Sequence, residues 1–201
     1  ITNIFTGSFG MSKRGAVPIR GKAVSPSECG EDSFCISENE KEVVLGVADG
    51  VGSWAESGYN PGLFAQSLMH NLSTFVKEYQ DKDDSLKSLL QKAFSKLVKD
   101  SENLEKRQKP IGSSTACVAS ICKHDLRLKY ANFGDSAMVI ISRKSSESID
   151  SLGVSFETKP LQRGFNWPYQ LTLYPSGSSE FESDDVETST EPINLKTGDI
   201  V

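Results

Sequence analysis

The stretch Gly46-Val47-Ala48-Asp49-Gly50-Val51-Gly52 decides how this sequence is expected to fold. It closes an apolar run that begins at Val43, and an unbroken run of this kind is typical of a strand covered on both faces. Asp49 ends that strand, where a carboxylate is costly unless a positive charge meets it. The glycines that follow let the backbone turn sharply and expose carbonyl oxygens, which are good ligands for hard cations. Asp-Gly pairs also form turns very often, so a purely turn-forming role for Asp49 is the alternative interpretation.

The same strand is expected to be the second half of a hairpin whose first strand is Ser33-Phe34-Cys35-Ile36. If the turn spans 38–41, Asp32 faces Val47 and lies diagonal to Asp49. A register shifted by one pair places the two carboxylates directly opposite each other. Both registers put them on one face at the same end of the hairpin, where a hydrated cation could bridge a diagonal gap of roughly 7–8 Å. A β-bulge in either strand would break this prediction.

The rest of the chain alternates between helical and strand patterns. Apolar residues recur at helical spacing over 61–79 and again over 85–104, which predicts two amphipathic helices. Short strands are expected next, at 115–122, 126–133 and 137–142. Two strand-rich blocks on either side of a helical pair predict an α+β fold with antiparallel sheets, because the connections within each block are short.

Composition and charge exclude several classes of protein. The 201 residues include 22 Lys and Arg and 27 Asp and Glu, a net charge of −5, with 37% hydrophobic side chains. This is a globular composition, long enough to bury a core, and we expect a single domain over 1–201. An acidic chain has no overall attraction for nucleic acid. Its longest apolar run, 43–48, is too short to cross a bilayer.

Cysteine, histidine and tryptophan side chains suggest no catalytic motif of their own. The spacings of the cysteines exclude Cys-x-x-Cys, and four cysteines in such a chain suggest reduced thiols in an intracellular compartment. Neither histidine has a partner for a hydrolase triad, and there is no P-loop. Trp54 and Trp167 are expected to be packing anchors rather than stacking platforms. The stretch 175–191 is Ser/Gly-rich and acidic, has no Lys or Arg, and is predicted to be a flexible surface loop.

Four short motifs, taken in order, carry a resemblance to a known family. They are Gly30-Glu31-Asp32, Gly46 to Gly52, Gly112-Ser113-Ser114-Thr115-Ala116 and Ala131-Asn132-Phe133-Gly134-Asp135-Ser136. In this order, and with the intervening helices, the sequence resembles the metal-dependent PP2C-type (PPM) serine/threonine phosphatases. Within that family it is most similar to the mitochondrial PPTC-seven-like branch, whose marks here are Trp54, Phe165-Asn166 and Pro168-Tyr169-Gln170-Leu171.

This resemblance implies a fold and a reaction. The fold would be a sandwich of two antiparallel β-sheets flanked by helix pairs, in agreement with the α+β pattern. The chain stops inside an apolar strand start at Ile200-Val201, so we expect a fragment whose C-terminal part is missing. The activity would be hydrolysis of phosphoserine and phosphothreonine in proteins through a water activated by two Mg²⁺ or Mn²⁺ ions.

The resemblance also assigns roles to individual residues. Asp49 matches the ligand that bridges the two ions, and Gly50 matches a main-chain carbonyl ligand. Glu31 and Asp32 match the acidic pair that holds metal-bound waters, and Asp135 matches an aspartate of an additional, weaker metal site. Asp32 and Asp49 are accordingly the catalytic candidates.

Three departures from the family pattern leave a second interpretation open. Val51 stands where many members have a His that is a candidate general acid, and only Lys22 could replace the usual phosphate-binding Arg. The later metal-ligating aspartates of the family would lie beyond Val201, so we expect little activity from this chain alone. The alternative is a catalytically inactive PP2C-like module that binds or regulates. For the enzyme, the expected partner is a phosphoprotein, the expected state a monomer, and the expected location intracellular, by resemblance mitochondrial.

Overall fold

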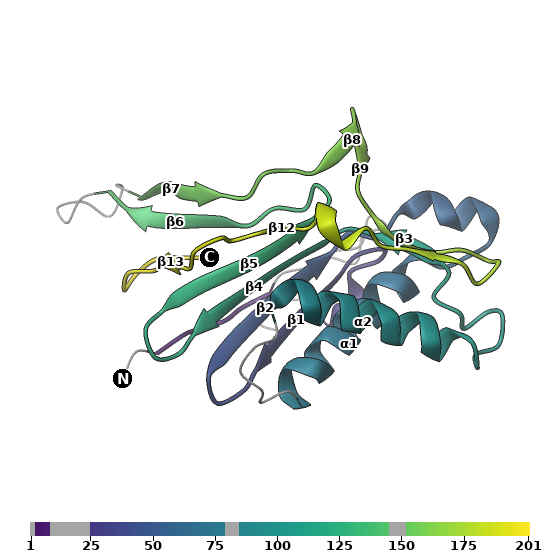
Figure 1. The fold of residues 1–201 in the computed structure, drawn as a ribbon, viewed down its shortest axis with the longest axis horizontal. Coiled ribbons are helices and arrows are strands. Elements are labelled where there is room, and N and C mark those ends of the chain that lie inside the picture. The colour runs from purple at the N-terminus through teal and green to yellow at the C-terminus, as the bar shows by residue number, and fades with distance from the viewer. Residues whose placement is uncertain (1–2, 9–24, 79–84, 145–151) are drawn as a thin grey trace.

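The computed structural model describes residues 3–8, 25–78, 85–144 and 152–201. Among these, six strands form the main antiparallel sheet, in the order β1-β2-β4-β5-β12 with β13 also paired to β5 (Figure 1). They are β1 (Ser33–Glu38), β2 (Glu42–Ala48), β4 (Ala116–Cys122), β5 (Arg127–Phe133), β12 (Glu187–Thr188) and β13 (Ile193–Asn194). The predicted α+β class with antiparallel sheets is confirmed.

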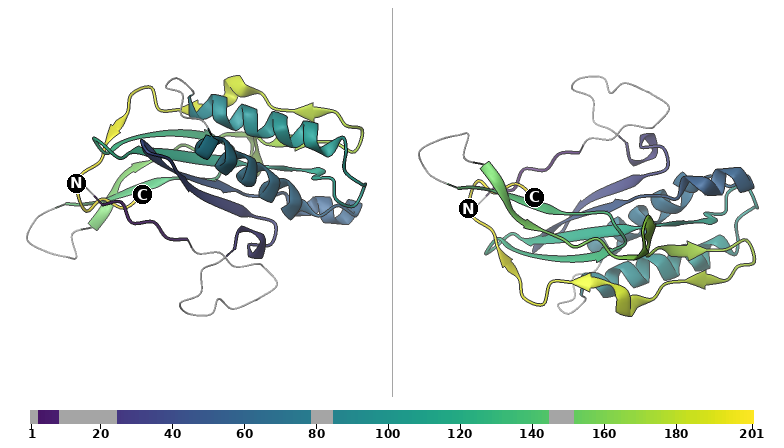
Figure 2. Two further views of the ribbon diagram at one scale, coloured as in Figure 1. Left: turned by 90° about the horizontal axis from the view of Figure 1, so that it is seen from below. Right: turned by 90° about the horizontal axis from the view of Figure 1, so that it is seen from above.

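Helices and short hairpins surround this sheet. The helices are η1 (Pro26–Glu28), η2 (Gly52–Ser57), α1 (Pro61–Glu78), α2 (Leu86–Ser101) and η4 (Ser183–Asp185). The other strands are β3 (Gly112–Ser114), β6 (Val139–Arg143), β7 (Leu152–Glu157), β8 (Gln162–Gly164), β9 (Trp167–Pro168), β10 (Leu171–Leu173) and β11 (Ser179–Glu180). Helices α1 and α2 cover one face of the main sheet, and the β6–β7 hairpin lies over the opposite face (Figure 2).

The first hairpin adopts the second of the two predicted registers. Ser33 pairs with Ala48, so Asp32 and Asp49 flank this pair at the open end of the hairpin. The turn is shorter than expected because the Asn39 side chain organises it: its Oδ1 accepts hydrogen bonds from the backbone N–H groups of residues 41 and 42, at 2.9 and 3.1 Å. No bulge interrupts the β1–β2 register.

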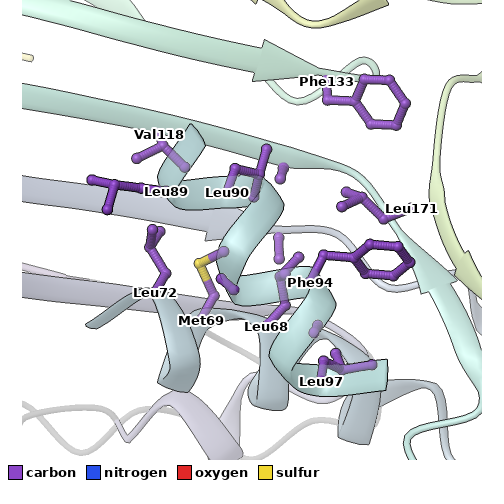
Figure 3. Packing of buried hydrophobic residues seen from close by; sticks show 14 of the residues in the cluster. Leu68, Met69, Leu72, Leu89, Leu90, Phe94, Leu97, Val118, Phe133 and Leu171 are labelled. Carbon is purple, nitrogen blue, oxygen red and sulfur yellow. The ribbon is translucent and has the colours of Figure 1, made fainter. Parts of the chain in front are cut away.

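The two helices pack against the sheet through the apolar stripes expected from the sequence. Each is capped by a polar side chain: Asn60 Oδ1 accepts from the Gly62 N–H at 3.1 Å, and Ser85 Oγ accepts from the Ser88 N–H at 3.1 Å. The largest fully buried side chains of the stripes are Phe64, Leu68, Met69, Leu72, Leu90 and Leu97, and all of them except Phe64 are labelled in Figure 3. This layer forms the larger core of the protein.

A second core lies on the other face of the same sheet. Along β4, Val118 faces the helices, whereas Cys117 and Ala119 face a cluster that includes Met138 and Ile140. Because successive side chains of a strand point to opposite faces, a strand buried on both sides is apolar throughout. The sheet is therefore the middle layer between two cores.

The stretch 175–191 differs from the flexible surface loop that was expected. It contains β11, η4 and β12, and it contributes the buried Val186 and the part-buried Phe181 to the larger core. β12 pairs with β5, through Glu187 and Asn132. Composition did not show this order because the pairing partner lies far away in the sequence.

Within the described ranges, no helix is both long and apolar enough to cross a membrane.

Truncation of a core side chain tests the packing of the larger core. Leu68 is completely buried, so Leu68→Ala should lower the free energy of unfolding by about 2–5 kcal/mol, since it removes apolar contacts and leaves a cavity. Urea denaturation followed by circular dichroism measures this change. The matched control is Leu104→Ala, at a position 37% exposed, and an equal loss in both variants would contradict this packing.

The buried thiols predict a pH dependence of stability. All four cysteines are free, as expected, and burial raises the pKa of both Cys35 and Cys117 to about 12. An unfolded thiol has a pKa of about 8.5, so the contribution of these thiols to stability is complete below that value and is lost as the pH rises toward 12. The urea midpoint should therefore fall between pH 7 and pH 10, and the double substitution Cys35→Ala/Cys117→Ala should make this fall with pH smaller. An equal fall in the double variant would show that these thiols ionise normally.

Candidate active site

The motifs singled out in the sequence meet at one end of the main sheet. β2 ends immediately before Asp49, and the chain then runs beside the link between β3 and β4. Thr115 donates its backbone N–H to the Asp49 carbonyl at 3.0 Å, and its Oγ1 accepts from the Asp49 N–H at 3.2 Å. Two residues further, the Val51 N–H donates to the Ser113 carbonyl at 3.0 Å. The Asp-Gly turn is thus fixed by backbone hydrogen bonds rather than left as a free loop.

Two glycines of this turn allow the acidic pair at 31–32 to approach it closely. A Cβ at Gly50 would collide with the backbone carbonyl of Glu31, and a Cβ at Gly52 would lie 2.8 Å from the Glu31 carboxylate. The backbone contact leaves no space for a larger residue at Gly50, whereas a Cβ at Gly52 would only displace the end of the Glu31 side chain. The sequence pattern therefore brings the Glu-Asp motif and the Asp-Gly turn into direct contact.

The third acidic position joins the same site through Thr115. The Oγ1 atom of Thr115 lies 2.6 Å from the Oγ atom of Ser136, the residue that follows Asp135. Gly134, which has a positive φ of 104°, packs so tightly that a Cβ there would lie 2.6 Å from Thr115 Cγ2. Asp135 accepts a hydrogen bond from Gln162 Nε2 at 3.1 Å. One buried threonine therefore links the turns of two predicted metal-ligating aspartates.

A buried asparagine side chain, that of Asn132, bonds the backbone close to the Asp135 turn. Asn132 is fully buried, and its Nδ2 donates to the carbonyl of Lys159 at 3.1 Å. Its Oδ1 is one of the two buried side-chain acceptors without a partner in the described part of the chain. A buried acceptor of this kind usually binds an ordered water. Asn132 and Thr115 lie within the sequence motifs, but their roles were not predicted; a polar residue inside an apolar strand was the available signal.

The chemistry of these donors suits a hard cation. The predicted ligands are the carboxylates of Glu31, Asp32, Asp49 and Asp135 and the main-chain carbonyl of Gly50, and oxygen ligands of this kind are those that Mg²⁺ and Mn²⁺ prefer. Asp49 is exposed, whereas the other three carboxylates are half-buried.

The acidic side chains do not form a complete ligand set by themselves. Within the described ranges, no three His, Cys, Asp or Glu side chains lie close enough together to hold a metal ion. A bound Mg²⁺ would therefore need main-chain carbonyls and waters as additional ligands, and Mg²⁺ commonly retains waters. The predicted phosphate-binding residue Lys22 lies outside the described residues.

A cysteine beside the acidic pair remains a neutral thiol. Burial, followed by the negative charges of Asp32 and Glu28, raises the pKa of Cys29 above its usual value. A thiolate, the form that binds metal, is therefore disfavoured at this position. The site presents oxygen donors rather than sulfur, which again favours hard cations.

The tight contact of Gly50 with Glu31 gives a direct test of this geometry. Gly50→Ala should lower the free energy of unfolding by about 1–3 kcal/mol, the usual cost of forcing extra volume into a packed site. Thermal or urea denaturation measures the loss. Gly7→Ala is the matched control, because a Cβ there meets nothing within 4 Å. Equal stability of both variants would mean that the acidic pair does not touch the turn.

Comparisons with known proteins identify the family of this chain. A family model described as protein phosphatase 2C matches residues 22–154. The chain is 36% identical over 174 residues to a Drosophila mojavensis protein named protein phosphatase PTC7 homolog fig, covering 86% of this chain and 51% of that protein. It is 30% identical over 203 residues to the Danio rerio protein phosphatase PTC7 homolog, covering 99% of this chain and 62% of that protein. The chain thus spans roughly half the length of these relatives.

Solved structures share the fold. The X-ray structure of the photosystem II phosphatase PBCP matches with a TM-score of 0.62 and 32% identity, over 85% of this chain and 56% of that one. A stage II sporulation E family protein from Thermanaerovibrio acidaminovorans, at a TM-score of 0.52 and 16% identity over 83% of this chain and 77% of that one, shares the fold alone. The expected PP2C-like fold and the resemblance to the PTC7-like branch are confirmed. The chain belongs to the protein phosphatase 2C family.

Proposed function

We propose that the protein from which this chain comes is a metal-dependent phosphatase that hydrolyses phosphoserine and phosphothreonine in proteins. The observation that carries the proposal is the hydrogen-bonded joint at Thr115, which fixes the turns of Asp49 and Asp135 at the same end of the sheet. Family membership supports the class of reaction. The proposal adds the ions, the residues that hold them and the class of phosphorylated side chain.

The proposed roles follow from the chemistry of the donors. A phosphomonoester dianion is repelled by a cluster of carboxylates, so the site requires cations to accept it. Two Mg²⁺ or Mn²⁺ ions, when bound, would neutralise the carboxylates, orient the phosphate and lower the pKa of a water for attack on phosphorus. Asp49 and the Gly50 carbonyl would hold these ions directly, Glu31 and Asp32 would hold their waters, and Asp135 would serve a third, weaker ion.

The position after the Asp-Gly pair provides no general acid. Val51 has no titratable side chain, and its backbone N–H donates to the Ser113 carbonyl. Val51 therefore helps to fix the turn and takes no part in proton transfer. Protonation of the leaving serine or threonine oxygen has to come from another group of the site.

Replacement of one carboxylate tests the proposal. In a protein extended to the length of its relatives, Asp49→Asn should reduce phosphate release from a phosphothreonine peptide by roughly 100-fold or more, the order of effect when charge stabilisation of a transition state is lost. The assay contains Mn²⁺ or Mg²⁺, and EDTA should abolish the activity. Isothermal titration should show weaker Mn²⁺ binding by the variant.

The matched control is a second aspartate at a turn. Asp125 lies between β4 and β5 and pairs with Arg127, so Asp125→Asn should retain activity and Mn²⁺ affinity. A folded, extended protein that releases no phosphate with either ion would contradict the enzyme proposal and favour a binding or regulatory module. The chain 1–201 alone should show little activity. The monomeric state, which is the default expectation, and the mitochondrial location, which the resemblance implies, remain predictions to be checked by light scattering and cell fractionation.

A further inference from the structure

The Asp135 turn rests on residues 159–162, the base segment that links β7 to the β8–β9 hairpin. The Leu161 N–H donates to the Gly134 carbonyl at 2.8 Å, and Gln162 Nε2 donates to the Asp135 carboxylate at 3.1 Å. Both the main chain and the carboxylate of the turn are therefore bonded to the base segment. The direction of the Asp135 carboxylate consequently depends on where the base segment lies.

The β8–β9 hairpin provides little packing that could hold the base segment. Phe165 is fully exposed and Trp167 is 63% exposed, so the prediction that Trp167 is a packing anchor was wrong, whereas Trp54 packs against the larger core as expected. In Figure 1 this hairpin stands away from the main sheet. It is tied to the base segment where the Tyr169 N–H donates to the Leu161 carbonyl at 3.2 Å. The tip therefore follows the base segment rather than fixing it.

The base segment is held at its other end, at Lys159. The preceding residue, Thr158, donates its N–H to the Met138 carbonyl at 3.0 Å, so Lys159 is where the chain leaves the β6–β7 sheet. The Lys159 carbonyl accepts from Asn132 Nδ2 at 3.1 Å, and its N–H donates to Glu187 Oε2 at 3.3 Å. Asn132 and Glu187 are paired residues of β5 and β12, so their side chains leave the sheet on the same face. Together they hold both main-chain groups of Lys159.

The Glu187 carboxylate is itself oriented by a buried tyrosine. The Tyr130 side chain is 8% exposed, and its hydroxyl donates to Glu187 Oε1 at 3.1 Å. Burial, followed by the negative charge of Glu187, raises the pKa of Tyr130 to about 12, so this hydroxyl keeps its proton near neutral pH. One oxygen of the carboxylate is thus bonded to β5, and the other accepts from the Lys159 N–H.

Two hydrogen-bonded steps join Glu187 to Asp135. The Glu187 carboxylate bonds the main chain at Lys159, and the residues that follow bond the Asp135 turn. Groups that orient a metal-ligating side chain through hydrogen bonds typically alter metal affinity by about 10–100-fold when they are replaced. Because Glu187 acts through one further step, the expected effect on an ion at Asp135 lies at or below the lower end of that range.

We propose that Glu187 is a positioning residue for the Asp135 carboxylate. Together with Asn132 it fixes the main chain of Lys159, and this places the base segment on which the Asp135 turn rests. The inference rests on the proposed function, in which Asp135 serves an ion. It gives a role to the acidic stretch 175–191, one of whose carboxylates supports the site through the backbone rather than as a ligand.

Hydrogen exchange tests this positioning without metal or substrate. In the protein extended to the length of its relatives, Glu187→Ala should speed exchange of the Leu161 amide by about tenfold, because one hydrogen bond that holds the base segment is lost. The Thr115 amide, which is bonded to the Asp49 carbonyl, should exchange at its original rate. Nuclear magnetic resonance measures both amides. Glu187→Gln keeps one acceptor oxygen and should give an intermediate rate at Leu161.

A second glutamate of the same stretch is the matched control. Glu180 accepts a hydrogen bond from the Tyr174 hydroxyl at 3.0 Å, so Glu180→Ala also breaks a Tyr–Glu pair but should leave the Leu161 amide unchanged. If Glu187→Ala does not fold, Tyr130→Phe removes only the hydroxyl that orients the carboxylate. That variant should give the same selective effect at Leu161, at a smaller size.

Manganese binding tests whether Glu187 acts through Asp135. By isothermal titration, Glu187→Ala should weaken the binding of the Asp135-dependent Mn²⁺ ion by about three- to tenfold. In an Asp135→Asn background the same substitution should have no further effect, because the two residues act through one carboxylate. Hydrolysis of p-nitrophenyl phosphate by Glu187→Ala should need more Mn²⁺ for its half-maximal rate, while kcat at saturating Mn²⁺ stays unchanged.

Several results would overturn the inference. Equal acceleration at the Leu161 and Thr115 amides would show that Glu187 stabilises the fold as a whole, and no acceleration would show that it does not hold the base segment. Additive losses of Mn²⁺ affinity in the double variant would show that Glu187 acts independently of Asp135. If Asp135→Asn leaves Mn²⁺ binding unchanged, the proposed ion at Asp135 fails, whereas a selective effect at Leu161 still supports the positioning by Glu187.

Discussion

The hydrogen bonds of Thr115 hold together the turns that make up the candidate site. Thr115 lies between β3, which pairs with β10, and β4, which belongs to the main sheet. At this change of sheet, its backbone and hydroxyl bond Asp49 on one side, and the hydroxyl meets Ser136 on the other. Because the residue is buried, an unmade bond there would cost the full desolvation penalty of a polar group. The place where the chain passes from one sheet to the next is therefore also the place where the acidic turns are fixed.

Local pattern was sufficient for the elements whose burial is decided within a few residues of sequence. The helices at 61–78 and 86–101 follow the apolar periodicity, and β2 and β4 follow continuous apolar runs that a middle layer between two cores requires. Pattern alone left two registers for the first hairpin, because the choice depends on how the Asn39 side chain organises the turn. It failed for 175–191, whose order comes from pairing with β5 across a long sequence separation.

The acidic residues of the candidate site stand out in the sequence, whereas the residues that hold their turns in place do not. A carboxylate at the end of an apolar strand is costly enough to attract attention, as with Asp49, and the resemblance added Glu31, Asp32 and Asp135. Thr115 and Asn132 act through contacts with residues far away in the chain, such as Lys159, so no spacing rule reveals them. Trp167 shows the opposite limit, because an aromatic residue in the sequence gives no sign of whether it packs inward or faces solvent.

The acidic turns and the hairpin at 162–168 are held in different ways in this fold. The acidic turns are held by backbone hydrogen bonds and by glycine contacts that leave no room for a side chain, so they tolerate little change. The hairpin at 162–168 touches that framework at its base, through the bonds to Gly134 and Asp135, and its tip side chains face solvent. Substitutions at the tip should therefore leave the carboxylates in place, whereas substitutions in the acidic turns disturb packed backbone.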